Sequence, residues 1–118
     1  MSGGIFSNAA RTESYRSGAK IFRAGDPGTV MYGVVEGEVE LQKGLSVIGV
    51  VKPGEVFGEL AIIDGSPRSL TATAVGDTTL AAIDREQFIA LVDRTPAFAL
   101  EVMESMASRM RSQDPGNH

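Results

Sequence analysis

The chain has 118 residues, a 42% hydrophobic share and a formal net charge of −4, from 11 basic and 15 acidic side chains. This length allows one domain, and the apolar share is enough for a packed core rather than a disordered chain. The acidic balance argues against a nucleic-acid partner, which needs a basic face. The chain has no cysteine, which excludes disulfides, thiolate metal ligands and cysteine nucleophiles.

The sequence shows no sign of a membrane span or of export. No apolar run approaches the length of about 18 residues that a spanning helix needs. Residues 1–10 lack the charged start and the long apolar core of a signal peptide. Together with the missing cysteine, these features favour a protein of the cytoplasm.

Turn residues divide residues 14–84 at intervals of about 8–12, which is typical of an all-β sandwich or barrel. They lie at Gly18, 25–28, Gly37, Gly44, 53–54, 65–67 and 76–77. The sequence therefore predicts many short strands in this region.

Two of these strands have distinct patterns. The first alternates between an apolar and an acidic face, which is typical of a half-buried strand; its faces carry Val35, Val39 and Leu41 and, opposite them, Glu36, Glu38 and Glu40. We interpret the glutamates as a solvated face rather than a metal or acid–base cluster. The second is a denser apolar run at 47–51, which suits a strand covered on both sides.

From Asp84 onward the apolar period becomes helical. Asp84 is a predicted N-cap of a short helix at 85–93, with Glu86 in its first turn. Residues 95–96, Thr-Pro, predict the start of a second helix of about four turns. We expect its apolar stripe to pack on the strands, to form a lid or to form a dimer seam. The stripe consists of Phe98, Val102, Met106 and Met110, widened by Leu100, Met103 and Ala107.

Residues 57–74, F-G-E-L-A-I-I-D-G-S-P-R-S-L-T-A-T-A, carry the most chemical information. Glu59 can accept from a sugar hydroxyl, and Arg68 has the planar charged donor fork that suits phosphate. Gly58 lets the backbone approach a ligand closely, and free N–H groups at the start of a short helix favour an anion. This segment can therefore hold a ribose and a charged phosphate together.

The segment resembles the phosphate-binding cassette of the cyclic nucleotide-binding domain family, found in the bacterial catabolite activator, protein kinase A regulatory subunits and nucleotide-gated channels. The similarity covers about residues 13–113, with opening strands at 18–41, including turns at 25–28 and 36–37, and closing helices at 84–111. It implies one cyclic nucleotide-binding domain over residues 1–118. The implied fold is mainly β with flanking α: a double-stranded β-helix, or jelly-roll-like β-roll, at about 14–84, followed by two C-terminal helices at about 85–114.

The resemblance also implies roles for the cassette residues. Arg68 matches the arginine that pairs with the exocyclic phosphate oxygens, and Glu59 matches the acceptor of the ribose 2′-hydroxyl. Ser69 matches a position that donates to phosphate in some members. Thr71, two residues further on, shares a strand face with Ser69. Backbone N–H groups that meet sugar or phosphate are implied at Gly58, Leu60 and Ala61.

The purine end is implied less directly. Positions that contact the base in the catabolite activator fall at Gln113 and Asp114, which are not hydroxyl residues. Arg109, one turn earlier, is expected to reach the ligand or to pair with Glu59. The lid over the base is expected from Met106 or Met110.

Catalysis is not expected. The only histidine is His118, the last residue, so a hydrolase triad has no base and a metal cupin has no ligand cluster. No Walker loop or dinucleotide-binding glycine motif is present. We expect a binding protein without a cofactor or a metal.

The function implied by the resemblance is that of a stand-alone sensor of a cyclic mononucleotide. The expected ligand is cAMP, with cGMP as the alternative, and binding is expected to move the C-terminal helix and so to signal to an unknown protein effector. The chain ends at residue 118, shortly after Arg111, which leaves no room for a helix-turn-helix domain. A homodimer through the C-terminal helix is compatible with its wide stripe. The alternative is a protein-interaction β-roll with a vestigial nucleotide pocket.

Overall fold

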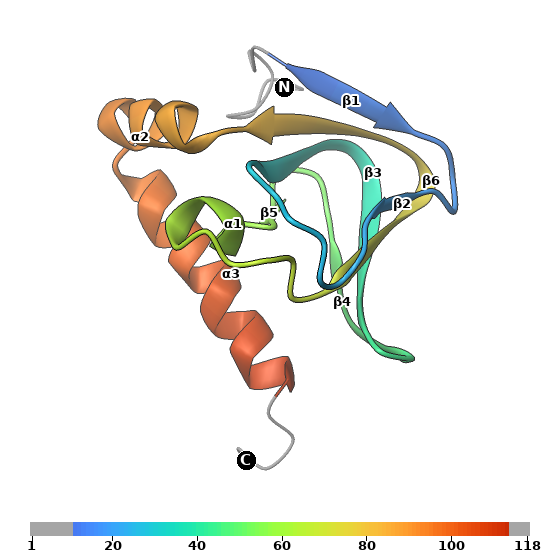
Figure 1. Ribbon diagram of the computed structural model, residues 1–118. Coiled ribbons are helices and arrows are strands. Elements are labelled where there is room, and N and C mark those ends of the chain that lie inside the picture. Colours follow the sequence, from blue (N-terminus) through green and yellow to red (C-terminus); the bar gives the residue numbers. More distant parts are fainter. Residues whose placement is uncertain (1–10, 114–118) are drawn as a thin grey trace.

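The computed structural model describes residues 11–113, with side chains as far as residue 111. In this part of the chain an antiparallel β-roll is followed by two helices, as Figure 1 shows, which confirms the predicted fold class. The strands are β1 (Thr12–Tyr15), β2 (Lys20–Phe22), β3 (Met31–Lys43), β4 (Ser46–Val51), β5 (Val56–Phe57) and β6 (Thr71–Ile83). The helices are α1 (Leu60–Ile63), α2 (Arg85–Arg94) and α3 (Ala97–Gln113).

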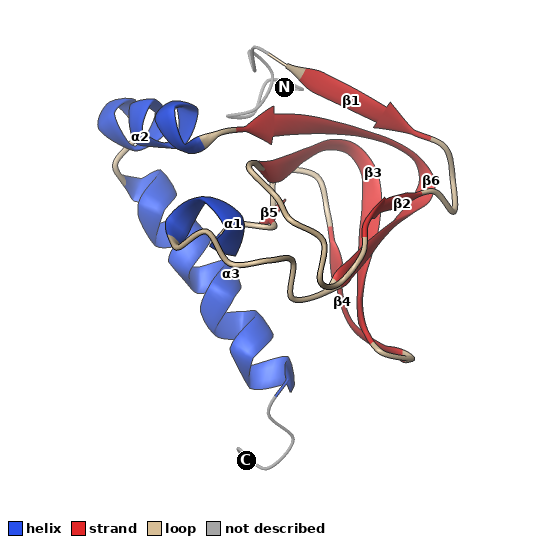
Figure 2. Cartoon of the chain, viewed as in Figure 1, coloured by secondary structure: helices blue, strands red, loops and turns tan. Residues whose placement is uncertain are grey.

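Two long strands, β3 and β6, form the centre of the roll. Each has 13 residues, and they pair with each other from Met31↔Ile83 to Gln42↔Thr71. β1 and β2 pair with β6, whereas β4 and β5 pair with β3, in the order β1-β6-β3-β4. Figure 2 shows the helices gathered on one side of the curled strands.

Two of the predicted turns lie inside these long strands instead. Gly37 in β3 and Gly76 in β6 have φ of +83° and +71°, and the register between the strands shifts at Gly37. A Cβ atom on Gly37 would lie 2.5 Å from the carbonyl oxygen of Asp77 and from the Thr78 hydroxyl. The prediction of strand breaks here is wrong, because the glycines allow a bulge and a close approach within continuous strands.

The bulge changes which side chains of β3 share a face. Val34 lies with Val39 and Leu41 in the cluster inside the roll, whereas Val35 packs against a second cluster under the helices. The predicted grouping of Val35 with Val39 is therefore wrong. Glu36, on the same strand, is exposed as expected.

The core consists of these two clusters. The cluster inside the roll comprises Val30, Tyr32, Val34, Val39, Leu41, Val51, Phe57, Leu70, Ala72, Leu80 and Ala82. The cluster between the roll and the helices comprises Met31, Val56, Ile62, Ala81, Ile83, Phe98 and Val102. Both long strands contribute to both clusters, so one pair of strands supports the whole domain.

β4 is covered on one side only. Val51 is buried, but Val47 is 52% exposed and Val50 is 43% exposed. Val47 and Val50 pair with Gln42 and Glu40 of β3, so their side chains lie on the face of the sheet opposite the cluster inside the roll. The prediction of a strand covered on both sides is wrong for this reason.

The helices begin where the sequence indicates. Asp84 caps α2, because its side chain accepts from the backbone N–H of Gln87 while the Gln87 side chain accepts from the backbone N–H of Asp84. The carbonyl of Thr95 accepts from the N–H of Phe98 at 2.9 Å, which starts the first turn of α3.

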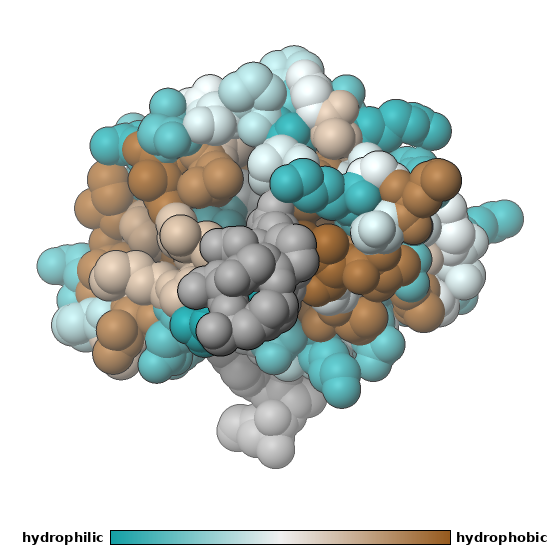
Figure 3. All heavy atoms as spheres, turned by 90° about the horizontal axis from the view of Figure 1, so that it is seen from below, coloured by the Kyte–Doolittle hydropathy of each residue, from teal (hydrophilic) through white to brown (hydrophobic). Residues whose placement is uncertain are grey.

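Burial decreases along α3 toward its C-terminal end. Phe98 and Val102 are fully buried, Met106 is partly buried, and Met110 is 67% exposed. Leu100 and Met103 are also exposed, so one side of the stripe packs on the roll and the rest faces outward. Figure 3 shows hydrophobic residues beside hydrophilic ones on the face seen from below.

Candidate nucleotide-binding site

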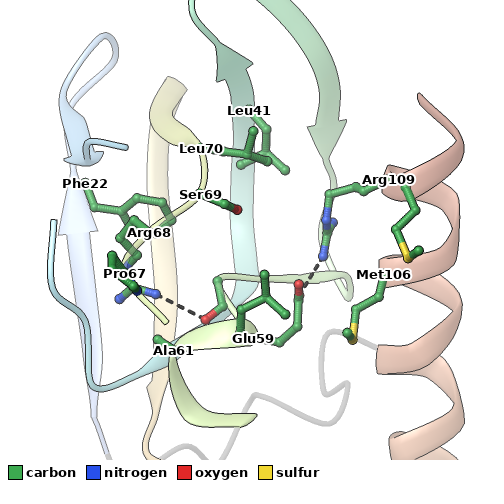
Figure 4. Close-up of a pocket in the computed structure, with 13 residues that line it drawn as sticks. Phe22, Leu41, Glu59, Ala61, Pro67, Arg68, Ser69, Leu70, Met106 and Arg109 are labelled. Carbon is green, nitrogen blue, oxygen red and sulfur yellow. Dashed lines mark hydrogen bonds and ion pairs between the residues drawn. The ribbon is translucent and has the colours of Figure 1, made fainter. Parts of the chain in front are cut away.

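A cavity of about 180 Å³ opens between the cassette, the inside of the roll and α3. Figure 4 shows its lining side chains, which reach it from both ends of the chain. The lining residues are Phe22, Leu41, Gly58, Glu59, Leu60, Ala61, Pro67, Arg68, Ser69, Leu70, Met106, Arg109 and Met110.

The cassette turns sharply from β5 into α1 at Gly58. This glycine has φ +76°, and a Cβ atom there would lie 2.8 Å from Nη1 of Arg68. Glu59 is the N-cap of α1 but makes no side-chain capping bond. Its carboxylate is therefore directed into the cavity rather than used on its own helix.

Glu59 pairs with Arg109 across the cavity. Nη2 of Arg109 donates to Oε1 of Glu59 at 2.6 Å, and the two side chains are 16% and 7% exposed. Burial raises the pKa of the Glu59 carboxyl, and the nearby Arg109 charge partly offsets this rise. This contact joins the cassette to α3, which was one of the two expected roles of Arg109.

Arg68 is a buried cation on the opposite side of the cavity. The residue is 7% exposed, and its Nη1 donates to the carbonyl oxygen of Gly58 at 3.1 Å. Its Nε is buried and has no hydrogen-bond partner among the described residues. Burial lowers the pKa of the guanidinium.

The guanidinium rests on an aromatic cluster inside the roll. Its Cζ lies 4.2 Å from the centroid of the Phe22 ring and 5.7 Å from that of Tyr32. The Phe22 and Tyr32 rings are stacked with centroids 6.2 Å apart, and Phe57 lies 5.9 Å from Phe22 and 5.3 Å from Tyr32. The cavity thus has the Glu59 carboxylate on one side and, on the other, the Arg68 guanidinium against the face of an aromatic ring.

Comparison with known proteins identifies the family of this domain. The family model described as "Cyclic nucleotide-binding domain" matches residues 12–95, which is most of the chain. The chain belongs to the cyclic nucleotide-binding domain family. The predicted resemblance is confirmed.

Relatives of this domain include regulators and channels. The cyclic AMP receptor protein of Thermus thermophilus is 38% identical over 108 residues, which cover 85% of this chain and 49% of that protein. A cyclic nucleotide-gated potassium channel of Mesorhizobium japonicum is 36% identical over 103 residues, which cover 87% of this chain and 28% of the channel. The chain thus spans half or less of the length of these curated relatives.

Solved structures agree with the assignment. The crystal structure of the Thermus thermophilus catabolite activator protein matches with a TM-score of 0.74 and 36% identity, covering 88% of this chain and 51% of that one. A structure titled "cAMP bound PfPKA-R (141-441)" matches with a TM-score of 0.77, covering 88% of this chain and 36% of that one, but at 24% identity it supports the fold alone.

The cyclic nucleotide-binding domain brings most of the predicted site residues into one cavity. Thr71 is not among them: its hydroxyl accepts from the backbone N–H of Ala24 at 3.1 Å and so holds a loop of the roll. The side chain of Gln113, and all of Asp114 and His118, lie outside the described residues. The predicted residues that line the cavity are Gly58, Glu59, Leu60, Ala61, Arg68, Ser69 and Arg109, together with Met106 and Met110.

Sequence reasoning missed four lining residues of the domain. Phe22 and Leu41 come from β2 and β3, and their apolar character alone indicates core positions rather than a site. Pro67 and Leu70 belong to the cassette itself and flank the predicted Arg68 and Ser69. The only signal in the sequence for Pro67 and Leu70 was their position next to the predicted binding residues.

Residues 11–113 contain no group of three or more histidine, cysteine, aspartate or glutamate side chains placed to hold a metal ion. None of the helices formed by those residues has the length and apolarity required to cross a membrane.

Proposed function

We propose that this cyclic nucleotide-binding domain binds cAMP in the cavity between the cassette and α3 and acts as a sensor. The observation that carries the proposal is that Glu59 and Arg68, both nearly fully buried, line the same cavity. Buried charges are costly unless a partner compensates them. A ribose hydroxyl and a cyclic phosphate are complementary to these two groups.

The proposed role of each polar side chain follows from the hydrogen-bond donors or acceptors that it does not already use within the protein. Arg68 has a buried Nε–H without an acceptor among the described residues, and an anionic phosphate oxygen would supply one. Glu59 uses Oε1 on Arg109, and its second oxygen can accept from a 2′-hydroxyl. Ser69 lines the cavity beside Arg68 and adds a hydroxyl donor.

The purine is expected to lie against α3. Met106 and Met110 line the cavity on this side, and their flexible thioether side chains can adapt to a flat ring. Met110 is 67% exposed in this structure, so a purine face would give it a partner. We therefore propose that binding orders the distal part of α3 and that this movement is what a protein effector detects.

The choice of cAMP over cGMP rests on the relatives. Cyclic AMP stands in the names of both the Thermus receptor and a Dictyostelium discoideum cAMP-dependent protein kinase regulatory subunit, which is 32% identical over 89 residues. A structure titled "A cyclic-GMP-dependent signalling pathway regulates bacterial phytopathogenesis" is 30% identical with a TM-score of 0.71. Both ligands are therefore included in the test.

A homodimer through α3 and a location in the cytoplasm complete the proposal. Leu100 and Met103, 57% and 55% exposed, form the outward side of α3 that a second copy would cover. Sedimentation of the wild-type protein and of Leu100→Lys would test this contact. The rival function, a protein-interaction β-roll, would use the same exposed surface without any nucleotide.

Titration calorimetry with cAMP and cGMP, side by side, tests the proposal. Binding to the native state also raises the free energy of unfolding, by about 2.7 kcal/mol at a hundredfold excess over the dissociation constant. Arg94→Met, at an exposed position of α2, is the control for loss of a positive charge. If neither nucleotide binds or stabilises the protein, the vestigial-pocket alternative holds.

A further inference from the structure

Phe22 lies in contact with the guanidinium of Arg68, although it belongs to β2 and not to the cassette. Both residues line the cavity. We propose that Phe22 is a positioning residue: its ring holds Arg68 in the orientation that receives the cyclic phosphate. This inference rests on the proposed function, because it explains how Arg68, the proposed phosphate-binding residue, is oriented before the nucleotide binds.

The charge on Arg68 requires such a support. In the part of the chain that the structure describes, the ion pairs are Arg11–Glu13 and Arg109–Glu59, and Arg68 belongs to neither. The carboxylates of Asp26 and Glu59 act on its charge only from a greater distance, and a buried cation without a direct ion pair is destabilising. The face of the Phe22 ring, 4.2 Å from Cζ, compensates part of that charge through a cation–π contact.

An aromatic support has an advantage that a carboxylate lacks. The N–H donors of a guanidinium lie in its plane, whereas a ring attracts the charge through the face. Phe22 can therefore hold the side chain without using a donor. Nη1 is already bonded to the Gly58 carbonyl, while the buried Nε–H stays available for a phosphate oxygen.

Gly28 limits the guanidinium at a second point. A Cβ atom built on Gly28 would lie 2.4 Å from both Cζ and Nε of Arg68. The same loop is fixed to the backbone of Arg68, because Gly25 N–H donates to the Arg68 carbonyl at 2.7 Å and Arg68 N–H donates to the Asp26 carbonyl at 2.8 Å. The seat formed by Phe22 and Gly28 is thus held in register with Arg68.

A double-mutant cycle tests the role of Phe22 in binding. Phe22→Leu should weaken cAMP binding by roughly two- to thirtyfold, the range of a cation–π contact. Phe22→Tyr should restore affinity to within about threefold, because it keeps the ring. In an Arg68→Gln background, Phe22→Leu should cause no further loss, since the contact is already absent.

The cycle separates positioning from packing. If Phe22 only supports the fold, its loss will be the same in both backgrounds, and this result overturns the proposal. Full affinity in Phe22→Leu overturns it as well. A second readout is the ratio of affinities for the two phosphorothioate diastereomers of cAMP, which should move toward one in Phe22→Leu, because a displaced guanidinium distinguishes the two exocyclic oxygens less well.

A measurement without ligand keeps this inference distinct from the proposed function. In the nucleotide-free protein, the ring current of Phe22 should shift the NMR signals of the Arg68 Hε and Hδ protons upfield, and Phe22→Leu should remove most of this shift, leaving the smaller contribution of the more distant Tyr32 ring. If the shift is present but the wild-type protein does not bind cAMP, the proposed function is wrong while the contact of Phe22 with Arg68 is supported. If the shift is absent, Phe22 does not position the Arg68 guanidinium.

Gly28→Ala provides an independent variant that leaves the ring in place. Its added methyl meets the flexible end of Arg68, which can move, so the fold is preserved while the guanidinium is displaced. We expect the upfield shift to be reduced and cAMP affinity to fall by at least threefold. Gly49→Ala in β4, where a Cβ atom meets nothing within 4 Å, is the matched control and should change neither. Equal results for the two variants would refute the role of Gly28.

Discussion

The carboxylate of Glu59 and the guanidinium of Arg109 lie 2.6 Å apart, although 50 residues separate them in the chain. One stands at the start of α1 and the other near the end of α3. Together they close the cavity on one side, and their contact joins the cassette to α3.

Removing Arg109 should make the stability of the ligand-free protein more sensitive to pH. The Glu59 pKa is raised in the folded state, so its contribution to stability is complete below the unfolded pKa and is lost as pH rises through the folded pKa. Arg109→Met removes a charge that lowers this pKa, so the decrease in the free energy of unfolding with rising pH should become larger. Urea unfolding between pH 4 and 8, roughly the range around a perturbed carboxyl, measures it. The double variant Glu59→Gln/Arg109→Met should be free of the added pH dependence; if the dependence persists there, Glu59 is not its source.

Glu59→Gln should weaken recognition of the ribose. A hydrogen bond to a charged group contributes about 1.5–3 kcal/mol, or roughly tenfold to a hundredfold in affinity. The variant should also bind cAMP and its 2′-deoxy analogue almost equally, while the wild-type protein prefers cAMP. Competition titration with both nucleotides measures the preference, with the exposed Glu36→Gln as control. A wild-type protein that does not distinguish the analogues would remove Glu59 from this role.

Arg68→Met should separate binding from folding. The substitution removes a buried charge that no described carboxylate pairs with, and methionine fills similar space against Phe22. We expect the free energy of unfolding without ligand to stay level or to rise by about 1 kcal/mol. Affinity for cAMP should fall by about thirtyfold or more, since loss of one partner of a desolvated charge pair costs about 2–5 kcal/mol. Urea unfolding and calorimetry on the same samples test both, and unchanged affinity contradicts the phosphate assignment.

Nucleotide should protect the distal half of α3. Burial decreases from Val102, 2% exposed, to Met110, 67% exposed, so the last turns have little packing of their own. We expect cAMP to slow amide exchange between residues 103 and 111 as well as in the cassette. Deletion after Glu104 removes three lining residues and should weaken binding while the roll stays folded. Protection confined to residues 57–72, with normal binding by the shortened chain, would exclude α3 as the lid.

The local signals in the sequence predicted the site more accurately than they predicted the strands. Gly58, Glu59 and Arg68 lie close together in the chain within one motif, and all three line the cavity. Gly37 looked like a turn because glycine is a common break. Whether it ends a strand or forms a bulge depends on how closely Asp77 and Thr78 approach it, and only the tertiary structure determines that distance.

Long-range contacts explain the remaining differences. Phe22 contacts Arg68 through the pairing of β2 with β6, which no local pattern indicates. Thr71 shares an alternating pattern with Ser69, but it bonds to the loop at Ala24 rather than lining the cavity. Exposure of Val47 and Val50 follows from the register of β4 with β3, which shifts between Leu41 and Gln42 and places both valines on the outer face.

Because β3 and β6 contribute to both apolar clusters, we expect the domain to unfold as a single cooperative unit. Neither cluster can lose its packing while both strands stay in place, because each strand has side chains in both. The roll and the helix layer should therefore melt together in one transition, with calorimetric and van't Hoff enthalpies that agree. Free energy gained by the cassette would accordingly be distributed to amides far from it, as far as the end of β6 at Ile83.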